Sequence, residues 1–207
     1  MFITFEGPEG SGKSTQIRLL AAWLHEQSVE VVMTREPGGT AIGDQIRGVL
    51  HDIDNTAMSA SAEILLYSAS RAQIVSELIN PALAAGKVVL CDRYFDSTYA
   101  YQGYGRGLDL DSLKLITEFA TGGLTPSVTF MLDIDVERGI ARRVDNDEEM
   151  NRLDLEAIEF HQRVRQGYFA LIEQSPERWQ VIDADRPIET IQIELRERCA
   201  ALLRISL

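Results

Sequence analysis

The segment Gly7-Pro-Glu-Gly10-Ser-Gly12-Lys13-Ser14 constrains this chain most, because it lies between an apolar, strand-like run and an amphipathic helical pattern. It matches G-x-x-x-x-G-K-[S/T]. In this motif glycines let the backbone turn with positive φ and direct its N–H groups at phosphate oxygens. The N-terminus of the following helix adds partial positive charge. The segment therefore predicts a site for a nucleoside triphosphate.

Two side chains of this segment carry chemistry that a purely structural turn does not need. Lys13 is placed to reach the β- and γ-phosphates, and the hydroxyl of Ser14 is placed to bind Mg²⁺. The residues expected to line the phosphate site are Gly7, Pro8, Glu9, Gly10, Ser11, Gly12, Lys13, Ser14 and Thr15.

Apolar runs of strand length alternate with longer helical patterns, which is typical of a parallel sheet covered by helices. Ordinary globular composition, with 45% apolar and 25% charged residues, fits such a fold. We expect one α/β domain over residues 1–207, with a five-stranded parallel sheet flanked by helices on both faces. The predicted strands are residues 2–6, 30–34, 87–91, 127–133 and 179–183.

Helical spacing accounts for much of the remaining chain. Apolar residues recur on one face of residues 17–24 and 191–202, where they indicate packing against a core. Residues 59–85 are expected to be helical, with Pro81 either kinking that helix or starting a new one. A further helix is expected over residues 109–121, ended by Gly122-Gly123.

The charge balance limits the partners. Twenty basic against 32 acidic residues give a net charge of −12, which argues against nucleic acid or an anionic membrane as the main partner. Seventeen of the 20 basic residues are arginines, which suit a small phosphate ligand. The distant Cys91 and Cys199 are expected to be buried, reduced thiols, and with no apolar run near 20 residues we expect a cytoplasmic protein.

Other features narrow the class of P-loop protein. None of the three lysines lies in the N-K-x-D run of a GTPase, and a motor or helicase is normally larger. Two strands end in an acid, Asp92 and Asp133, that could hold magnesium-bound water at the ligand edge of the sheet. We prefer Asp92 because Arg93 follows it; Asp133 could equally be a helix cap with Asp135.

A charged segment between two helical patterns, residues 142–152, has almost nothing apolar to bury. It is expected to be exposed and mobile. It is either a solvated loop or a lid, about residues 142–153, that closes over a ligand.

Together these motifs resemble the bacterial thymidylate kinases. The resemblance rests on the P-loop, Thr34–Thr40 with Arg47, Arg71, the run Asp92–Gly103 and the arginines of the predicted lid. It implies a P-loop kinase fold with a mobile lid, and phosphoryl transfer from Mg-ATP to dTMP, giving dTDP and ADP for dTTP synthesis. It also implies a homodimer, with residues 59–85 or their neighbours as the two-fold surface.

The resemblance also implies roles for residues on the acceptor side. Arg93 would hold the acceptor phosphate, Arg71 would reach thymine O4, and Tyr67 would stack on the base. Thr98 and Gln102 would read the base edge, and Tyr101 would exclude a ribose 2′-hydroxyl. Tyr67 could instead be a core aromatic beside the packing residues Leu65 and Leu66. Glu36, Pro37 and Arg47 belong to the acceptor-side loop.

In some relatives an arginine inside the P-loop stabilises the transferring phosphoryl group, but this chain has Glu9 there. Glu9 is expected near the acceptor 3′-hydroxyl or a metal-bound water, and the arginine must come from the lid. The candidates, in order, are Arg152, Arg143 and Arg142. The acidic insert 145–149 spaces them more widely than in bacterial relatives. Arg186 is expected near the adenine pocket.

Three other functions stay open at this point. A kinase for another nucleoside monophosphate would lack the set of Tyr67, Arg71, Thr98 and Gln102. An ATP-dependent ligase would show little phosphoryl transfer to nucleotides. A non-catalytic nucleotide-binding module would need neither acceptor arginines nor a lid.

Overall fold

The computed structural model describes residues 1–145 and 151–205. Within them, five parallel strands form one sheet with the order β2-β3-β1-β4-β5. The strands are β1 (Phe2–Glu6), β2 (Val31–Arg35), β3 (Val88–Asp92), β4 (Val128–Asp133) and β5 (Trp179–Asp183). The predicted α/β fold is confirmed, with β2 and β3 each shifted one residue toward the C-terminus.

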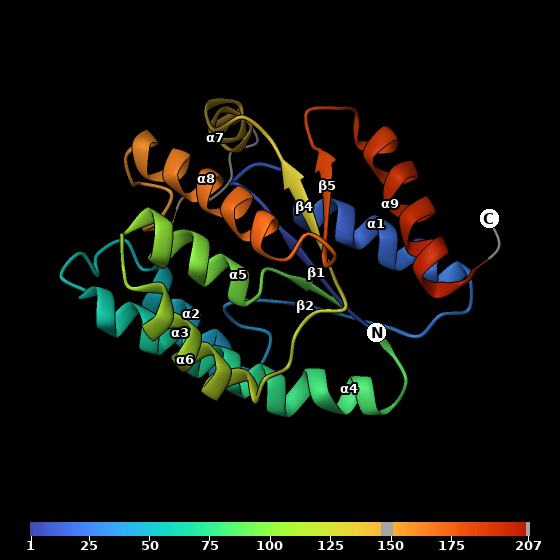
Figure 1. Ribbon diagram of the computed structural model, residues 1–207, viewed down its shortest axis with the longest axis horizontal. Coiled ribbons are helices and arrows are strands. Elements are labelled where there is room, and N and C mark those ends of the chain that lie inside the picture. Colours follow the sequence, from blue (N-terminus) through green and yellow to red (C-terminus); the bar gives the residue numbers. More distant parts are fainter. Residues whose placement is uncertain (146–150, 206–207) are drawn as a thin grey trace.

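Helices cover both faces of the sheet, as Figure 1 shows. Two long helices, α1 (Lys13–Glu26) and α9 (Ile188–Leu203), pack together on one face. The other face is covered mainly by α2 (Ala41–His51), α3 (Ala60–Ile74), α4 (Asn80–Ala84), α6 (Leu110–Thr121) and α8 (Ile158–Gln174). Shorter elements are the π-helical turns η1 (Val75–Ile79) and η2 (Tyr99–Gly105), α5 (Phe95–Thr98) and α7 (Val136–Asp145).

Alternation along the strands divides the core into two clusters, because successive side chains of a strand point to opposite faces. Ile3 and Phe5 of β1 pack with Leu20 of α1 and Leu195 of α9. Phe2, one residue earlier, packs on the other face with residues of α3, α6 and α8. The apolar stripe predicted at residues 17–24 is therefore core.

Residues 59–85 form the expected helical run in three pieces. Ser59 caps α3 through a bond from the Ala62 N–H, η1 follows α3, and Pro81 lies in the first turn of α4. Pro81 thus starts a new helix, as one of the two predictions had it. The π turn directly precedes this proline, whose ring and missing N–H do not fit a regular helical ladder. Asp109 and Gly122 bound α6 as predicted.

The topology places the predicted nucleotide loop at the centre of the sheet. β1 lies between β3 and β4, and Phe5 pairs with Asp92, so the loop after β1 starts beside the end of β3. Ligands of parallel α/β sheets bind at the carboxyl ends of the strands, where the strand order reverses.

Two further sequence predictions bear on the whole molecule. Cys91 and Cys199 are buried free thiols, while the cytoplasmic location stays a prediction. Across the described residues we find no helix with the length and apolar character needed to cross a membrane. Residues 146–150, the middle of the predicted lid and most of the acidic insert, lie outside the described residues.

Candidate active site

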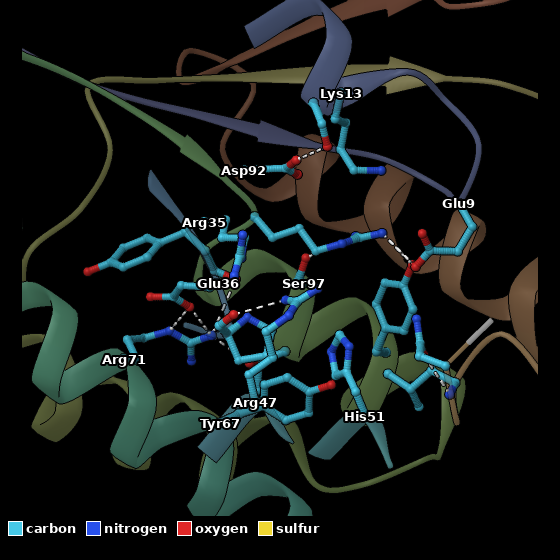
Figure 2. Close-up of a pocket in the computed structure, with 18 of the residues that line it drawn as sticks. Glu9, Lys13, Arg35, Glu36, Arg47, His51, Tyr67, Arg71, Asp92 and Ser97 are labelled. Atoms are coloured by element: carbon cyan, nitrogen blue, oxygen red, sulfur yellow. Dashed lines mark hydrogen bonds and ion pairs between the residues drawn. The ribbon is translucent and has the colours of Figure 1, made fainter. Parts of the chain in front are cut away.

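A cavity of about 790 Å³ opens at the carboxyl ends of β1 and β3. Its walls come from the P-loop, the loop after β2, helices α2 and α3, and the segment from β3 through η2. In Figure 2, Lys13 and Asp92 lie at one end of this cavity and Tyr67 and Arg71 at the other. The two ends of the cavity offer different environments: backbone groups of the P-loop line one end, and side chains line the other.

The P-loop end is shaped by close backbone packing. Gly10 has φ 69°, and a Cβ there would collide with the carbonyl oxygen of Gly139 in α7. A Cβ on Gly139 would in turn collide with the carbonyl oxygen of Glu9. Glycine is therefore required on both sides of this contact, which joins the phosphate loop to the start of α7.

Lys13 is folded against its own loop. Its ammonium donates to the carbonyl oxygens of Gly7 at 3.1 Å and Pro8 at 2.8 Å and to the Ser11 hydroxyl at 3.1 Å. Burial and the nearby charge of Arg93 lower its pKa to about 8, so the side chain is still a cation at pH 7. The loop thus holds a buried positive charge at the N-terminus of α1.

Asp92 is the acid that the structure brings to the P-loop. Its Oδ2 accepts a hydrogen bond of 2.5 Å from the Ser14 hydroxyl. Asp133, the alternative, instead forms two bonds of 2.7 Å with Arg165, and Asp135 caps α7 through the amides of Glu137 and Arg138. A hydroxyl beside a carboxylate, both oxygen donors, fits the ligand preference of Mg²⁺.

Arg93 lies between the two ends of the cavity with a strained backbone, at φ 68°. Its partner is not Asp92, the only local acid that the sequence offered, but Glu9, at 2.7 Å. The Gly7 carbonyl and three hydroxyl groups accept its remaining bonds. These hydroxyls belong to Ser97, Tyr101 and Tyr168.

Glu9 forms ion pairs with two arginines of the site, Arg93 and Arg143. Oε1 accepts bonds from Arg93 and Tyr101, and Oε2 pairs with Arg143 at 3.2 Å. Burial alone would raise the pKa of Glu9, but the charges of Arg93, Lys13 and Arg143 outweigh it and hold the pKa far below its usual value. Glu9 is therefore a carboxylate that assembles arginines where phosphates would bind.

The three predicted lid arginines point to different places. Arg143 lines the cavity and pairs with Glu9 and Asp154. Arg142 binds the Ala184 carbonyl and Asp185. Arg152 binds Glu63 and the Leu50 carbonyl.

The predicted exposure of residues 142–152 is confirmed at Val144 and Asp145 and is wrong at Arg143 and Arg152. Arg143 and Arg152 are turned inward, because buried carboxylates on other elements supply partners that the segment's own sequence lacks. Arg186 does not line the cavity; it binds Asp183 and Glu194 at the end of β5.

At the far end, Arg71 of α3 is fully buried and pairs with Glu36 at 2.7 Å. It also donates to the Thr98 hydroxyl at 3.0 Å. One nitrogen of this pair, Nη1 of Arg71, and one oxygen, Oε1 of Glu36, have no hydrogen-bond partner among the described residues. Buried polar atoms are normally paired, so these two atoms indicate room for a polar ligand. Tyr67, one turn before Arg71, forms part of both the cavity wall and the core.

The loop after β2 forms part of the cavity wall at the end that contains Arg71. The Glu36 N–H donates to the Asp92 carbonyl, and Arg47 of α2 donates to the Pro37 carbonyl at 2.9 Å. Gln102 of η2 also lines the cavity. Thus Glu36, Pro37, Arg47, Tyr67, Arg71, Arg93, Thr98, Tyr101 and Gln102, the predicted acceptor set, all lie along one cavity.

Sequence reasoning did not single out several residues of the site. Arg35 and His51 line the cavity, and burial together with Arg47 lowers the pKa of His51 to about 4. Ser97 and Tyr168 both hold Arg93 and both bind the buried carboxylate of Glu6. Ser97 lies in the run that carried the resemblance, but no local signal marks Tyr168 or Glu6.

Known proteins resemble this chain in sequence and in fold. A family model described as thymidylate kinase matches residues 5–195. A thymidylate kinase of Roseiflexus castenholzii is 54% identical over 98% of this chain and 92% of its own length, and one of Clostridium novyi is 50% identical over 94% and 96%. The crystal structure of thymidylate kinase from Ehrlichia chaffeensis has a TM-score of 0.78 and 33% identity, covering 96% of this chain and 97% of its own.

Proposed function

Since the chain belongs to the thymidylate kinase family, it transfers a phosphoryl group from ATP to dTMP, and we propose that the cavity between the P-loop and α3 is where this happens. The observation that carries the proposal is the position of Arg93. On one side of it lies the phosphate loop, and on the other lies the Arg71–Glu36 pair, in which one atom of each residue has no hydrogen-bond partner among the described residues. Two anionic substrates need such a shared cation between them.

The donor end holds the triphosphate. Backbone N–H groups of residues 9–15 would cradle its oxygens, and Lys13 would exchange the Gly7 and Pro8 carbonyls for phosphate oxygens. Ser14 and Asp92 would hold Mg²⁺, which supplies charge neutralisation on the β- and γ-phosphates when bound.

Two arginines that both pair with Glu9 would supply the positive charge around the transferring phosphoryl group. Arg93 and Arg143 contact opposite oxygens of Glu9, so their guanidinium groups are positioned before substrates arrive. Positioned cations stabilise the charge on the transferring group without reorganisation. Arg143 is therefore our choice for the arginine that reaches the γ-phosphate, in place of Arg152.

The acceptor end reads the nucleotide. Tyr67 would stack on the thymine ring, and the free Nη1 of Arg71 would donate to O4. Thr98 and Gln102 would face the base edge. Tyr101, whose hydroxyl donates to Glu9, would stand near the sugar.

We also propose a homodimer through the layer of α2, α3 and α6, which lie side by side in Figure 1. Large apolar side chains are exposed on these three helices, foremost Phe119 at 92% and Leu115 at 70%. Leu65, expected to pack inside, is 59% exposed, because it lies off the face of α3 that carries Tyr67 and Arg71. A Phe119→Asp variant should run as a monomer in light scattering; a wild-type monomer would exclude the dimer.

The test of function is ADP formation from Mg-ATP with dTMP, dUMP, UMP, CMP, AMP or GMP, and without acceptor. Turnover should be strongest with dTMP and nearly absent without acceptor. Preference for another monophosphate would overturn the base-reading set, and acceptor-independent hydrolysis would overturn the acceptor site altogether. Nucleotide binding without any turnover would point to the ligase or the binding module.

A further inference from the structure

Glu63, in the first turn of α3, is a buried carboxylate with an unusual number of donors. It is 1% exposed, and the nucleotide-binding motifs do not include it. Oε1 accepts from the Gln102 amide nitrogen at 2.9 Å and from Arg106 Nε at 2.8 Å. Oε2 accepts from Arg106 Nη2 at 3.2 Å and pairs with Arg152.

Two arginines keep this group charged. Burial works to raise the pKa of Glu63, but hydrogen bonds from Arg106, Gln102 and Arg152 prevail and lower it. An ionised carboxylate has no proton to donate, so it accepts from every group that it contacts.

The charge of Glu63 therefore determines which way the Gln102 amide points. An amide side chain has a donating end and an accepting end, and Glu63 binds the donating end. The other end, Oε1, accepts no hydrogen bond from the residues that the structure describes, and Gln102 lines the cavity. The reversed orientation would set the amide oxygen against a buried carboxylate, which is unfavourable.

We propose that Glu63 is a positioning residue for base selection: it holds Gln102 with its oxygen available to the nucleobase. A pyrimidine whose N3 carries a hydrogen, as in thymine and uracil, can donate to that oxygen. Cytosine has an acceptor at N3 and meets an acceptor there. The proposal deepens the proposed function and rests on it, since it takes Gln102 to face the base.

Glu63 holds its own position through its arginine partners. Arg106 is shared with Glu156, whose carboxylate pairs at 2.9 Å with Nη2, the nitrogen that also donates to Glu63 Oε2. This offers a matched pair of variants, because Glu63→Gln and Glu156→Gln each remove one acidic partner of Arg106. Only the first also removes the carboxylate from Gln102.

The experiment compares dUMP with dCMP, which differ at N3 and C4 but share the absent 5-methyl group. In Glu63→Gln the Gln102 amide is free to turn and present its nitrogen to the base. The ratio of kcat/KM for dUMP over dCMP should fall about tenfold, the order of one buried hydrogen bond. In Glu156→Gln the ratio should stay within about twofold of wild type.

A double variant separates positioning from general damage. If Glu63 acts through Gln102, adding Glu63→Gln to Gln102→Leu should not lower the ratio further. Should Glu63→Gln fail to fold, Glu63→Asp keeps a negative charge near both arginines but shortens the side chain by one methylene, which weakens the contact with Gln102, and it should lose part of the preference. Dissociation constants of dUMP and dCMP by calorimetry give the same ratio without turnover.

The outcomes separate two failures. If the wild type does not phosphorylate dTMP, the proposed function itself fails. If the wild type is active but Glu63→Gln or Glu63→Asp keeps the wild-type ratio, or shifts it no more than Glu156→Gln does, the role of Glu63 is overturned and the function stands. A further fall in the double variant would also overturn it, because Glu63 would then act by another route.

Discussion

The two faces of the sheet are built on different principles. Under α1 and α9 the core is mostly apolar, with Leu20, Leu24 and Leu195 completely buried, and its buried polar side chains include the uncharged amides of Gln16 and Gln192. The opposite face buries charged residues as well, among them Glu6, Glu36, Glu63, Arg71 and Asp96. Buried charges cost stability unless each has a partner. The comparison teaches that one face supplies stability while the other uses part of it to hold charges beside the cavity.

The largest effect should come from the apolar face. Leu20→Ala removes a completely buried side chain and should lower the free energy of unfolding by about 3–5 kcal/mol in urea denaturation. The neighbouring Leu19, which is 36% exposed, gives the control, and Leu19→Ala should cost under about 0.5 kcal/mol. The KM for dTMP should not change in either variant; a changed KM would mean that the two faces are not independent.

Lys13→Met should have the reverse profile. Losing this cation from the phosphate loop should lower kcat about 10²- to 10³-fold, or about 2.7–4 kcal/mol in the transition state. Stability should fall little, because Lys13 is buried with only carbonyl and hydroxyl acceptors around its ammonium. Lys87→Met, at the exposed pair with Glu30, is the control and should leave kcat unchanged. Near-normal turnover in Lys13→Met would remove the P-loop from the mechanism.

Glu6 tests what a buried charge costs on the charged face. Burial and the charge of Asp96 raise its pKa from 4.5 to about 7. The unfolded chain then loses this proton near pH 4.5 and the folded chain near pH 7, so this group lowers stability as pH rises between those values. The full change is up to about 3 kcal/mol at 1.36 kcal/mol per unit.

Glu6→Gln should remove this dependence. Its melting temperature should fall less than that of the wild type between pH 5 and pH 7, whereas Glu26→Gln, at the exposed end of α1, should follow the wild type. Parallel curves for wild type and Glu6→Gln would show that Glu6 is ionised throughout and well compensated.

The smallest effect concerns the arginines near the end of α7. Arg143→Ala should lower turnover at least tenfold, about 1.4 kcal/mol, with a smaller change in the dissociation constant of dTMP. Arg142→Ala, one residue away and bound to Asp185 instead, should change turnover less than twofold. A larger loss in Arg152→Ala than in Arg143→Ala would restore the order expected from the sequence.

Local patterns predicted most of the fold because they depend on neighbours in the chain. The strands, the helix with Pro81 in its first turn and the P-loop all follow from spacing and residue type. The resemblance to a known family then predicted, from its motifs, which residues bind the acceptor nucleotide. The same reasoning placed Leu65 in the core wrongly, since hydrophobicity alone does not distinguish the inner face of α3 from its outer face.

Contacts between distant segments could not be predicted in this way. The pairing of Arg93 with Glu9 joins β3 to the P-loop, and that of Gln102 with Glu63 joins η2 to α3. Neither spacing nor composition contains the geometry that brings such residues within 3 Å of each other. The buried partners of Arg143 and Arg152 were missed for the same reason.

The contact between Gly10 and Gly139 has a consequence for how this sequence can vary. Each backbone occupies the space that a side chain on the other would need, so no compensating substitution exists at either position. In a library randomised at both positions, the active clones should carry glycine at both Gly10 and Gly139. The phosphate loop and the helix carrying Arg143 are thus constrained together, although 128 residues lie between Gly10 and Gly139.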